Sequence, residues 1–417
     1  MPRLAPPRDP VTMHFDGQAV VAERGEPAAV ALVAAGHLAL ARSPKFHRPR
    51  GPSCLRAACD GCLARVDGEP NVMTCRVAAA EGMRVETQNV VGSKDTDLLR
   101  MADWFFPEGM NHHELLAGVP GVQRVMQAFA RRVAGLGRLP KETVAPRPAA
   151  RRDADVLIVG AGASGMAAAL ELGRRGRRVE VVDDALTWGG SVRALTGSAR
   201  AAWEPLLRAF GEAVAAARVS LRLETTAAGI YGDDVLVGGP AGIEVVTART
   251  VVLAPGAHDG VLGFEGNDVP GVMSARAAGW LLGHGVRPGE HMLVTVAEGG
   301  GPFGEAVAGA LDGVEVVRGV PTRARGSGRV KEVTVVETGG AERRVKCDTL
   351  LVDAARGPAY ELCAQAGAEL RHEPRGYVVN VKAGSRVRPG FLAVGEAVGT
   401  ALVVAQVVEE SRELADA

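Results

Sequence analysis

Aromatic residues are scarce in this 417-residue sequence, and neither sign of charge is in excess. Phe, Trp and Tyr together make up 4% of the chain, which argues against an aromatic cage for a cationic amine. Lysine plus arginine and aspartate plus glutamate both number 48, so the net charge gives no reason to expect a nucleic acid or an anionic membrane surface as a partner.

Long apolar runs are also missing. No window approaches the roughly 18 uninterrupted apolar residues of a membrane-spanning helix, and the N-terminal stretch MPRLAPPRDP has no signal-peptide core. We therefore expect a cytoplasmic protein without a transmembrane segment, associated with a membrane only through partners, if at all. A chain of this length that is 47% hydrophobic can bury sizeable cores, and its length suggests two or three domains.

Cysteine is rare as well, but four of the six cysteines are clustered, at Cys54, Cys59, Cys62 and Cys75. In a reducing compartment such a cluster indicates metal ligands rather than disulfides. A C-x4-C-x2-C loop with a distant fourth cysteine holds a [2Fe-2S] cluster in plant-type ferredoxins. Zinc sites more often use two short paired knuckles, so a four-thiolate zinc site is the weaker alternative, followed by chance clustering.

The sequence around these cysteines predicts a small sheet with one helix. The pair Asp16-Gly17 is typical of a two-residue hairpin turn, and Pro27 is typical of a first helical turn. The predicted elements are two strands in residues 11–25, a helix in 26–37, and strands in 62–75 and 83–90. This order predicts a β-grasp, ferredoxin-like domain over residues 1–100.

Three arginines flank the cysteine loop: Arg48, Arg50 and Arg56. A cluster bound by four thiolates is negatively charged, so nearby cations should raise its reduction potential. A solvated basic face would explain the same residues equally well. The sequence therefore leaves three interpretations of these arginines open: a solvent-exposed face, tuning of the cluster potential, and docking of a partner.

A connector is expected over residues 101–152. Residues 112–137 have helical periodicity, and residues 135–153 are rich in Pro, Ala and Arg, which is typical of a linker. Adjacent residues on a helix point in different directions, so we interpret His112 and His113 as helix-start residues rather than as a metal site.

The strongest nucleotide signal follows at once, in the stretch ADVLIVGAGASGMAAALEL. A continuous apolar strand precedes the G-x-G-x-x-G pattern and an alanine-rich helix follows it, which is the context that this motif requires. Gly160 allows the tight turn, Gly162 lets the backbone approach a pyrophosphate, and Gly165 lets helix and strand pack closely. The next strand ends in Asp183, placed to accept hydrogen bonds from an adenosine ribose.

Later stretches resemble features of FAD-binding proteins with two dinucleotide-binding domains. Gly189 and Gly190 match the double glycine that follows the ribose acid, and TVVLAPGAHD resembles an ATGA turn with Pro255 in place of Thr. In RPGFLAVGEAVG, Glu396 stands where an aspartate usually binds the FAD ribityl chain. The order of these features favours FAD, bound by a domain built from residues 153–270 and 376–417.

Residues 271–375 predict a second, inserted nucleotide fold of NAD(P) type. A strand, a glycine run with Gly299, Gly301 and Gly304, a short helix and another strand follow one another. The second strand ends at Arg318 without an acid for a ribose hydroxyl, which leaves NADP, another nucleotide or a vestigial fold open. The sequence thus predicts an α/β protein, a β-grasp domain followed by a Rossmann-type flavoprotein fold.

No catalytic residue can be assigned. Cys347 and Cys363 are isolated, so the chain has no redox pair like that of a disulfide reductase, and both are expected to be buried apolar residues. Ser164 and Ser191 lie outside any G-x-S-x-G elbow, and no acid-base triad is apparent. Oxidation of an amine needs mainly a flavin that accepts hydride rather than a protein nucleophile.

Five stretches together resemble the α subunits of heteromeric sarcosine oxidases and related proline dehydrogenases, opine oxidases and hydrogen cyanide synthase. They are RSPKFHRPRGPS, RVAGLG, GAGASG, APGAHDGVLGFEGNDVPGVM and GHGVRPGEHMLV. The resemblance implies an FAD-containing subunit that works beside an amine-oxidising flavoprotein subunit of glycine-oxidase type. The sequence has no counterpart of the folate-binding half of the sarcosine oxidase chain, so we expect no tetrahydrofolate reaction.

We therefore expect an electron-transferring subunit, which passes electrons from the partner through FAD and the cluster to a quinone or a one-electron carrier. A flavin takes two electrons together and releases them singly, whereas the cluster takes one. Two alternatives stay open: a self-sufficient NAD(P)H-dependent reductase, and a non-catalytic scaffold whose nucleotide sites are structural.

Overall fold

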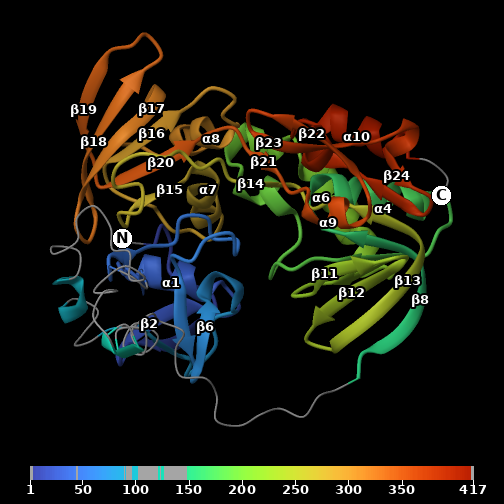
Figure 1. Ribbon diagram of the computed structural model, residues 1–417, viewed down its shortest axis with the longest axis horizontal. Helices are drawn as coiled ribbons and strands as arrows, with labels where there is room; N and C mark the ends of the chain where they lie inside the picture. The colour runs from blue at the N-terminus through green and yellow to red at the C-terminus, as the bar shows by residue number, and fades with distance from the viewer. Residues whose placement is uncertain are drawn as a thin grey trace.

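The computed structural model describes residues 3–43, 46–88, 90, 96–101, 121–122, 124–125 and 148–414. The predicted connector helix, with His112 and His113, and most of the predicted linker lie outside the described residues. Figure 1 shows the N-terminal unit in blue below a sheet in orange, with a third unit in green and red beside them.

The N-terminal unit is a five-stranded sheet with one helix. Its strands, in the order β2-β1-β7-β5-β6, are β2 (Gln18–Glu23), β1 (Pro10–Phe15), β7 (Arg84–Glu86), β5 (Leu63–Val66) and β6 (Glu69–Met73). Alternate residues of β1 are buried, and its turn to β2 places Asp16 and Gly17 at φ values of 48° and 82°. Helix α1 (Ala28–Ala34) buries all but its last residue. This is the β-grasp arrangement that the sequence predicts.

Short elements complete this unit around the cysteine loop. They are β3 (Ala41–Arg42) paired with β4 (Pro49–Arg50), and the 3-10 turns η1 (Thr74–Arg76) and η2 (Leu98–Arg100).

The third unit is built on an eight-stranded sheet. Its strands are β8 (Ala150–Val159), β9 (Val179–Val182), β10 (Val219–Arg222), β11 (Thr226–Tyr231), β12 (Asp234–Gly239), β13 (Gly242–Leu253), β24 (Arg386–Arg388) and β25 (Phe391–Ala393). β13 pairs along its length with β8, antiparallel with β12 in its first half and parallel with β25 in its second. The last four residues of β8 are buried, as expected for a parallel strand covered on both faces.

Helices cover this sheet and place the turns at its carboxyl edge. They are α4 (Ala163–Arg174), η3 (Gly190–Ala194), α5 (Gly197–Ala201), α6 (Glu204–Ala215), α9 (Glu361–Gln365), η5 (Gly395–Val398) and α10 (Val404–Arg412). Small buried side chains, mostly alanine, line α4, and α10 and α6 both contact this helix. The alanines let α4 lie close to the sheet, which brings its N-terminus to the end of β8.

β8 begins at Ala150, within the predicted linker, and this corrects the sequence prediction. The reason is a partly buried charge network across four strands, β8, β9, β10 and β13, which the local sequence of a Pro- and Arg-rich stretch does not reveal. Arg152 pairs with Glu180 at 2.5 Å and with Glu244 at 3.0 Å, and Arg222 pairs with Glu244 at 2.7 Å. These ion pairs hold the first residues of β8 against β9 and β13.

This network predicts a pH-dependent contribution to stability. The hydrogen bonds from Arg222, and then Arg152, hold the pKa of Glu244 below its usual range. Its stabilising effect is therefore complete above the ordinary pKa of glutamate and is lost as the pH falls through the lowered value. Glu244→Gln should lower the free energy of unfolding by about 1 kcal/mol at pH 7 and by much less near pH 3, measured by urea denaturation. The exposed Glu342 supplies the control, Glu342→Gln, and an equal loss for Glu244→Gln at both pH values would contradict the expectation.

The second nucleotide fold, which contains the orange sheet of Figure 1, has six strands in the order β15-β20-β16-β17-β18-β19. Its elements are β15 (Val272–Ser274), α7 (Ala275–Gly283), β16 (Met292–Val296), α8 (Phe303–Ala310), β17 (Val314–Gly326), β18 (Val330–Glu337), β19 (Glu342–Lys346) and β20 (Thr349–Asp353). β15, β20, β16 and the start of β17 are parallel, and the long β17 continues into an antiparallel hairpin with β18.

The chain crosses between the two large sheets twice, and the crossings lie side by side. β14 (Ala257–His258), on the way out, pairs antiparallel with β21 (Gly357–Pro358), on the way back. A separate hairpin, β22 (Glu369–Glu373) with β23 (Gly376–Asn380), follows, and η4 (Ala383–Ser385) leads into β24. The paired crossings fix Ala257 between the two sheets, where the candidate site is found.

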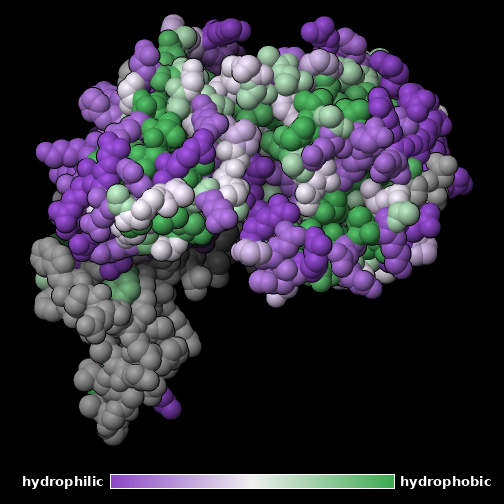
Figure 2. Space-filling view, turned by 90° about the horizontal axis from the view of Figure 1, so that it is seen from above, coloured by the Kyte–Doolittle hydropathy of each residue, from purple (hydrophilic) through white to green (hydrophobic). Residues whose placement is uncertain are grey.

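The visible surface is mixed. Figure 2 shows hydrophobic areas in green as separate patches among purple hydrophilic residues on this face of the molecule. Within the described residues, no helix combines the length and the apolar character needed to cross a membrane.

Candidate functional site

The four clustered cysteines come together in pairs. The sulfur atoms of Cys54 and Cys59 lie 3.3 Å apart, and the thiols of Cys62 and Cys75 are hydrogen-bonded to each other. Hydrogen bonding between the first two thiols lowers the pKa of Cys59 to about 5 and raises that of Cys54. In the part of the chain that the structure describes, no three His, Cys, Asp or Glu side chains converge on the position of a single metal ion. Two pairs of thiols fit a two-iron cluster, in which each iron takes one pair, better than one zinc ion.

The backbone of the cysteine loop points its amides at these sulfur atoms. The N–H groups of Arg56 and Ala58 donate to the Cys54 sulfur at 3.4 and 3.3 Å, and that of Ala57 donates to the Cys75 sulfur at 3.3 Å. Ala57 has a φ of 60°, an uncommon value for a residue with a side chain, so the loop is folded around the sulfurs at some cost. Such donors favour thiolates, the form that binds iron.

The first glycine loop packs so closely that side chains are excluded. A Cβ atom on Gly160 would lie 2.2 Å from the carbonyl oxygen of Ala254, and one on Gly165 would lie 1.8 Å from the carbonyl oxygen of Gly160. A Cβ atom on Gly190 would lie 2.8 Å from the Cα atom of Gly162. The double-glycine turn therefore touches the glycine loop, and both stand at the N-terminus of α4, where the free helix amides favour a phosphate.

Asp183 lies at the end of β9 beside this loop. Its carboxylate accepts the N–H of Ala161 at 2.6 Å and that of Ala185 at 2.8 Å. Burial raises the pKa of Asp183, while these two hydrogen bonds act in the opposite direction. Each carboxylate oxygen keeps a lone pair that can accept a hydrogen bond from a ribose hydroxyl. The next residue, Asp184, pairs with Arg76 of the N-terminal unit at 2.8 Å.

One cavity of about 370 Å³ joins the predicted nucleotide residues to the cysteine loop. Of the residues predicted from the sequence it is lined by Gly160, Gly162, Asp183, Gly190, Glu396 and Cys75. Residues 55–58 of the cysteine loop and Arg76 form another part of the wall. Gly165 and Gly189 are not among the lining residues, and Gly165 instead packs α4 against the loop. The glycine cradle, the helix amides and the acid together fit a dinucleotide such as FAD.

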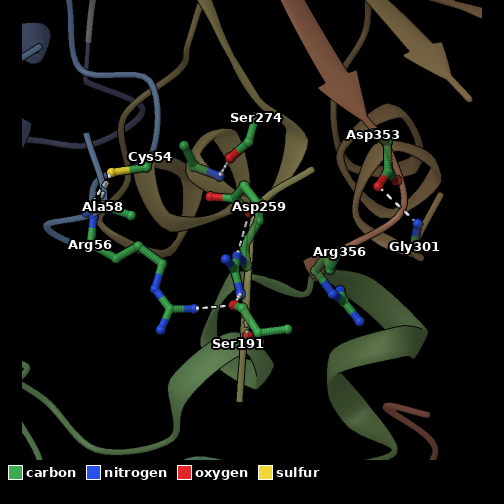
Figure 3. A network of polar contacts seen from close by, with 12 residues as sticks. Cys54, Arg56, Ala58, Ser191, Asp259, Ser274, Gly301, Asp353 and Arg356 are labelled. Carbon is green, nitrogen blue, oxygen red and sulfur yellow. Dashed lines mark hydrogen bonds and ion pairs between the residues drawn. The ribbon is translucent and has the colours of Figure 1, made fainter. Parts of the chain in front are cut away.

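Two arginines meet beside this cavity, and sequence analysis singled out only one of them, Arg56, which is labelled in Figure 3. Arg56 and Arg276 donate to the same carbonyl oxygen, that of Ala257, at 3.1 and 3.0 Å. Arg276 is 1% exposed and also donates to Asp259 at 2.7 Å and to Ser191 at 2.9 Å. The neighbouring positive charge of Arg276, followed by burial, lowers the pKa of Arg56. Arg56 is therefore not part of a solvated basic face.

Glu396 lies in η5 and lines the cavity, but its carboxylate is already engaged. It pairs with Arg356 at 2.5 Å, and both side chains are 13% exposed. The Arg356 guanidinium also lies 4.8 Å from the ring centre of Phe303 on α8. The predicted ribityl ligand thus lines the cavity, with one carboxylate oxygen in an ion pair with Arg356.

The second glycine run is filled by a side chain of the protein itself. Asp353, at the end of β20, accepts the N–H of Gly301 at 2.9 Å and that of Gly304 at 2.7 Å (Figure 3). It is 3% exposed, and burial raises its pKa. The carboxylate therefore accepts the hydrogen bonds of the amides that a pyrophosphate would need at the start of α8. Arg318 is exposed and pairs with Glu305 of this helix.

The N-terminal unit contacts the rest of the chain partly through two of the stretches that carry the family resemblance, the ones that contain HRPRG and GNDVPG. A Cβ atom on Gly51 would lie 3.4 Å from Pro270, and Arg50 lies 3.6 Å from Asp268. A backbone hydrogen bond of 2.9 Å joins the N–H of Ser274 to the carbonyl of residue 53. HRPRG and GNDVPG thus form opposite sides of one interface, which holds the cysteine loop against the cavity.

The two isolated cysteines are buried, as the sequence predicts. Burial raises the pKa of Cys347 and of Cys363 to about 12. Neither thiol is therefore suited to act as a nucleophile near neutral pH.

Comparison with known proteins agrees with this geometry. Residues 8–90 match the family described as 2Fe-2S iron-sulfur cluster binding domain, and residues 154–311 match the family described as pyridine nucleotide-disulphide oxidoreductase. The sarcosine oxidase subunit alpha of Rhizobium meliloti is 31% identical over 370 residues, which cover 80% of this chain and 37% of that protein. The chain is a homologue of the sarcosine oxidase α subunits.

This relationship confirms the resemblance stated from the sequence, and with it the predicted α/β fold class and an FAD-dependent oxidoreductase with a [2Fe-2S] domain. The sarcosine oxidase α homologues are longer, and the chain spans only 37–39% of their length. Subunit HcnA of the hydrogen cyanide synthase of Pseudomonas aeruginosa is 37% identical over 82 residues, 20% of this chain and 78% of that one.

Among solved structures, L-proline dehydrogenase from P. horikoshii has the same fold. It superposes with a TM-score of 0.71 at 23% identity, covering 98% of this chain and 73% of that one. At this identity the likeness speaks for the fold alone.

Proposed function

We propose that the chain is the electron-transferring subunit of a heteromeric amine or amino-acid dehydrogenase or oxidase. In this proposal residues 1–100 carry the cluster, residues 153–270 and 376–417 hold FAD, and residues 271–375 form an inserted fold without a nucleotide. The observation that carries the proposal is that the cysteine loop and Cys75 line the same cavity as Gly160 and Gly162. A flavin bound in this cavity and a cluster bound by its wall would be close enough to exchange electrons.

The bound groups would supply complementary chemistry, since FAD exchanges two electrons and the cluster exchanges one. The residues of the chain hold and tune them. Cys54, Cys59, Cys62 and Cys75 would hold the cluster, with the amides of residues 56–58 stabilising its sulfur ligands. Gly160, Gly162, Gly165, Asp183, Gly189, Gly190 and Glu396 would bind FAD or shape its site.

The proposed partner is an amine-oxidising flavoprotein subunit of glycine-oxidase type, and the proposed acceptor is a quinone or a one-electron carrier. The names of the homologues support a partner, because each homologue is itself one subunit of an oxidase or synthase. If the four clustered cysteines hold the cluster, the remaining described cysteines are the isolated and buried Cys347 and Cys363, which supports electron transfer rather than disulfide reduction. We place this activity in the cytoplasm, with membrane contact only through partners.

The main rival is a self-sufficient NAD(P)H-dependent reductase, and the position of Asp353 argues against it. The carboxylate accepts the amides of Gly301 and Gly304, and an anionic pyrophosphate would have to displace this buried group. We therefore expect that neither NADH nor NADPH bleaches the flavin of the purified protein under anaerobic conditions, measured near its visible absorbance maximum. Rapid bleaching by either nucleotide would favour the reductase.

A reductive titration tests the proposed function directly. Anaerobic protein titrated with dithionite should take up two electrons in its flavin bands and one more in a rhombic EPR signal of the reduced cluster. Co-expression with a candidate amine-oxidising subunit should then let the amine substrate produce the same signals. A flavin that accepts electrons from neither dithionite nor the partner would contradict the proposal and favour the scaffold reading.

A further inference from the structure

Arg56 belongs to the cysteine loop, yet it is one of the residues that line the nucleotide cavity. It lies between Cys54 and Cys59 in the sequence, and its side chain reaches across the interface to donate to the carbonyl of Ala257 at 3.1 Å. A guanidinium carries five N–H donors in a planar fork, and this hydrogen bond uses one of them. The other donors form no hydrogen bond with a described residue, and Arg56 is part of the cavity lining.

The acids around Arg56 are already paired with other arginines. These pairs are Asp184 with Arg76 at 2.8 Å, Asp259 with Arg276 at 2.7 Å, and Glu396 with Arg356 at 2.5 Å. No described carboxylate forms an ion pair with Arg56 itself, and Arg276 adds a second positive charge at the same carbonyl. This side of the cavity therefore has a cation that lacks an anionic partner.

The site that faces Arg56 is one built for an anion. The glycine loop and the double glycine touch each other at Gly162 and Gly190, next to Ser191, and Arg276 joins Ser191 to Ala257. The contacts thus run without a break from the phosphate loop to the carbonyl that Arg56 holds. A guanidinium fork matches the geometry of phosphate oxygens better than any other side chain does.

We propose that Arg56 is a nucleotide-binding residue, supplied by the iron-sulfur unit, whose guanidinium binds the pyrophosphate of the dinucleotide held at residues 160–190. This inference rests on the nucleotide site of the proposed function. It makes the cysteine loop a part of that site rather than a neighbour of it. Because the same residue flanks the cluster, the charge of the cluster and the affinity for the nucleotide are coupled, and the coupling is reciprocal.

The experiment uses ADP, which is the adenosine and pyrophosphate half of FAD. Full-length protein freed of flavin, with its cluster retained, is titrated with ADP by calorimetry. Arg56→Gln should weaken ADP binding at least tenfold relative to the unaltered protein, and Arg56→Lys should restore part of the loss because it keeps a point charge. Arg84→Gln serves as the matched control, since Arg84 is exposed on β7 of the same unit. The visible spectrum of the cluster and the melting temperature check that each variant is folded.

A second arm tests the coupling. Reduction of the cluster by dithionite adds a negative charge beside Arg56, so the Kd for ADP should rise about fivefold in the unaltered protein. An equal Kd in the oxidised and reduced states would overturn the coupling.

The outcomes separate this inference from the nucleotide site itself. If Arg56→Gln binds ADP as tightly as the unaltered protein, the inference is overturned while the site stands. If the unaltered protein does not bind ADP and Gly160→Ala retains its FAD, the nucleotide site and the inference fall together.

Discussion

Protein carrying Cys59→Ala is expected to lose the reduced-cluster EPR signal entirely and to retain its FAD. Cys59 forms one of the two thiol pairs, and alanine offers no ligand atom, so one iron would keep a single cysteine. The glycine loop that we assign to FAD lies on a different sheet and does not depend on this thiol for its shape. The measurements are the EPR spectrum after anaerobic dithionite reduction, the iron content and the flavin content of the purified protein.

The control for this substitution is Cys347→Ala, which removes a buried thiol far from the cluster in the sequence. It should cost about 1–2 kcal/mol of stability through the cavity that it leaves and change neither cofactor. Cluster signals that survive in Cys59→Ala would remove Cys59 from the ligand set. Loss of flavin together with the cluster would instead mean that FAD binding depends on the cysteine loop as well as on the glycine loop.

Gly165→Ala is expected to abolish FAD binding. Its Cβ atom would lie 1.8 Å from the carbonyl oxygen of Gly160, which is too close for any packing of the present backbone. Helix α4 would have to move away from β8, and the N-terminus of α4 would leave the phosphate position. We expect at least a tenfold weaker affinity for FAD and a lower melting temperature, measured by flavin fluorescence on titration and by thermal denaturation.

Gly173 provides a matched control on the same helix. A Cβ atom there would meet nothing within 4 Å, so Gly173→Ala should leave FAD binding unchanged and raise stability by up to about 1 kcal/mol, because alanine favours the helix. Unaltered FAD affinity in Gly165→Ala would show that the nucleotide does not use this loop.

Features that depend on local sequence were predicted well. The turn at Asp16-Gly17, the strand before Gly160 and the alanine-rich helix after it each follow from residues that are neighbours in the chain. The four cysteines could also be recognised as metal ligands, because their spacing alone is typical of a [2Fe-2S] site. The exact start of β8 was not predicted, because it depends on Glu180 and Glu244, which lie on other strands.

The features that sequence analysis missed join distant parts of the chain. Nothing local connects Asp353 to Gly301, 52 residues earlier, or Arg276 to Ser191, 85 residues earlier. A weak signal did exist for Arg276, since it is a charged residue within the small apolar stretch SARAAGWLLG. A buried arginine of this kind needs acceptors from elsewhere, and the sequence does not say where they are.

The contact between Gly51 and Pro270 has a consequence for protein engineering. The first hundred residues cannot be exchanged alone, because residues 50–53 dock against residues 268–274, which lie more than 200 positions later in the sequence. A chimera that exchanges the iron-sulfur unit for that of another protein must therefore exchange both stretches together. A graft of the first stretch alone would join an electron carrier to a protein that has no surface shaped to receive it.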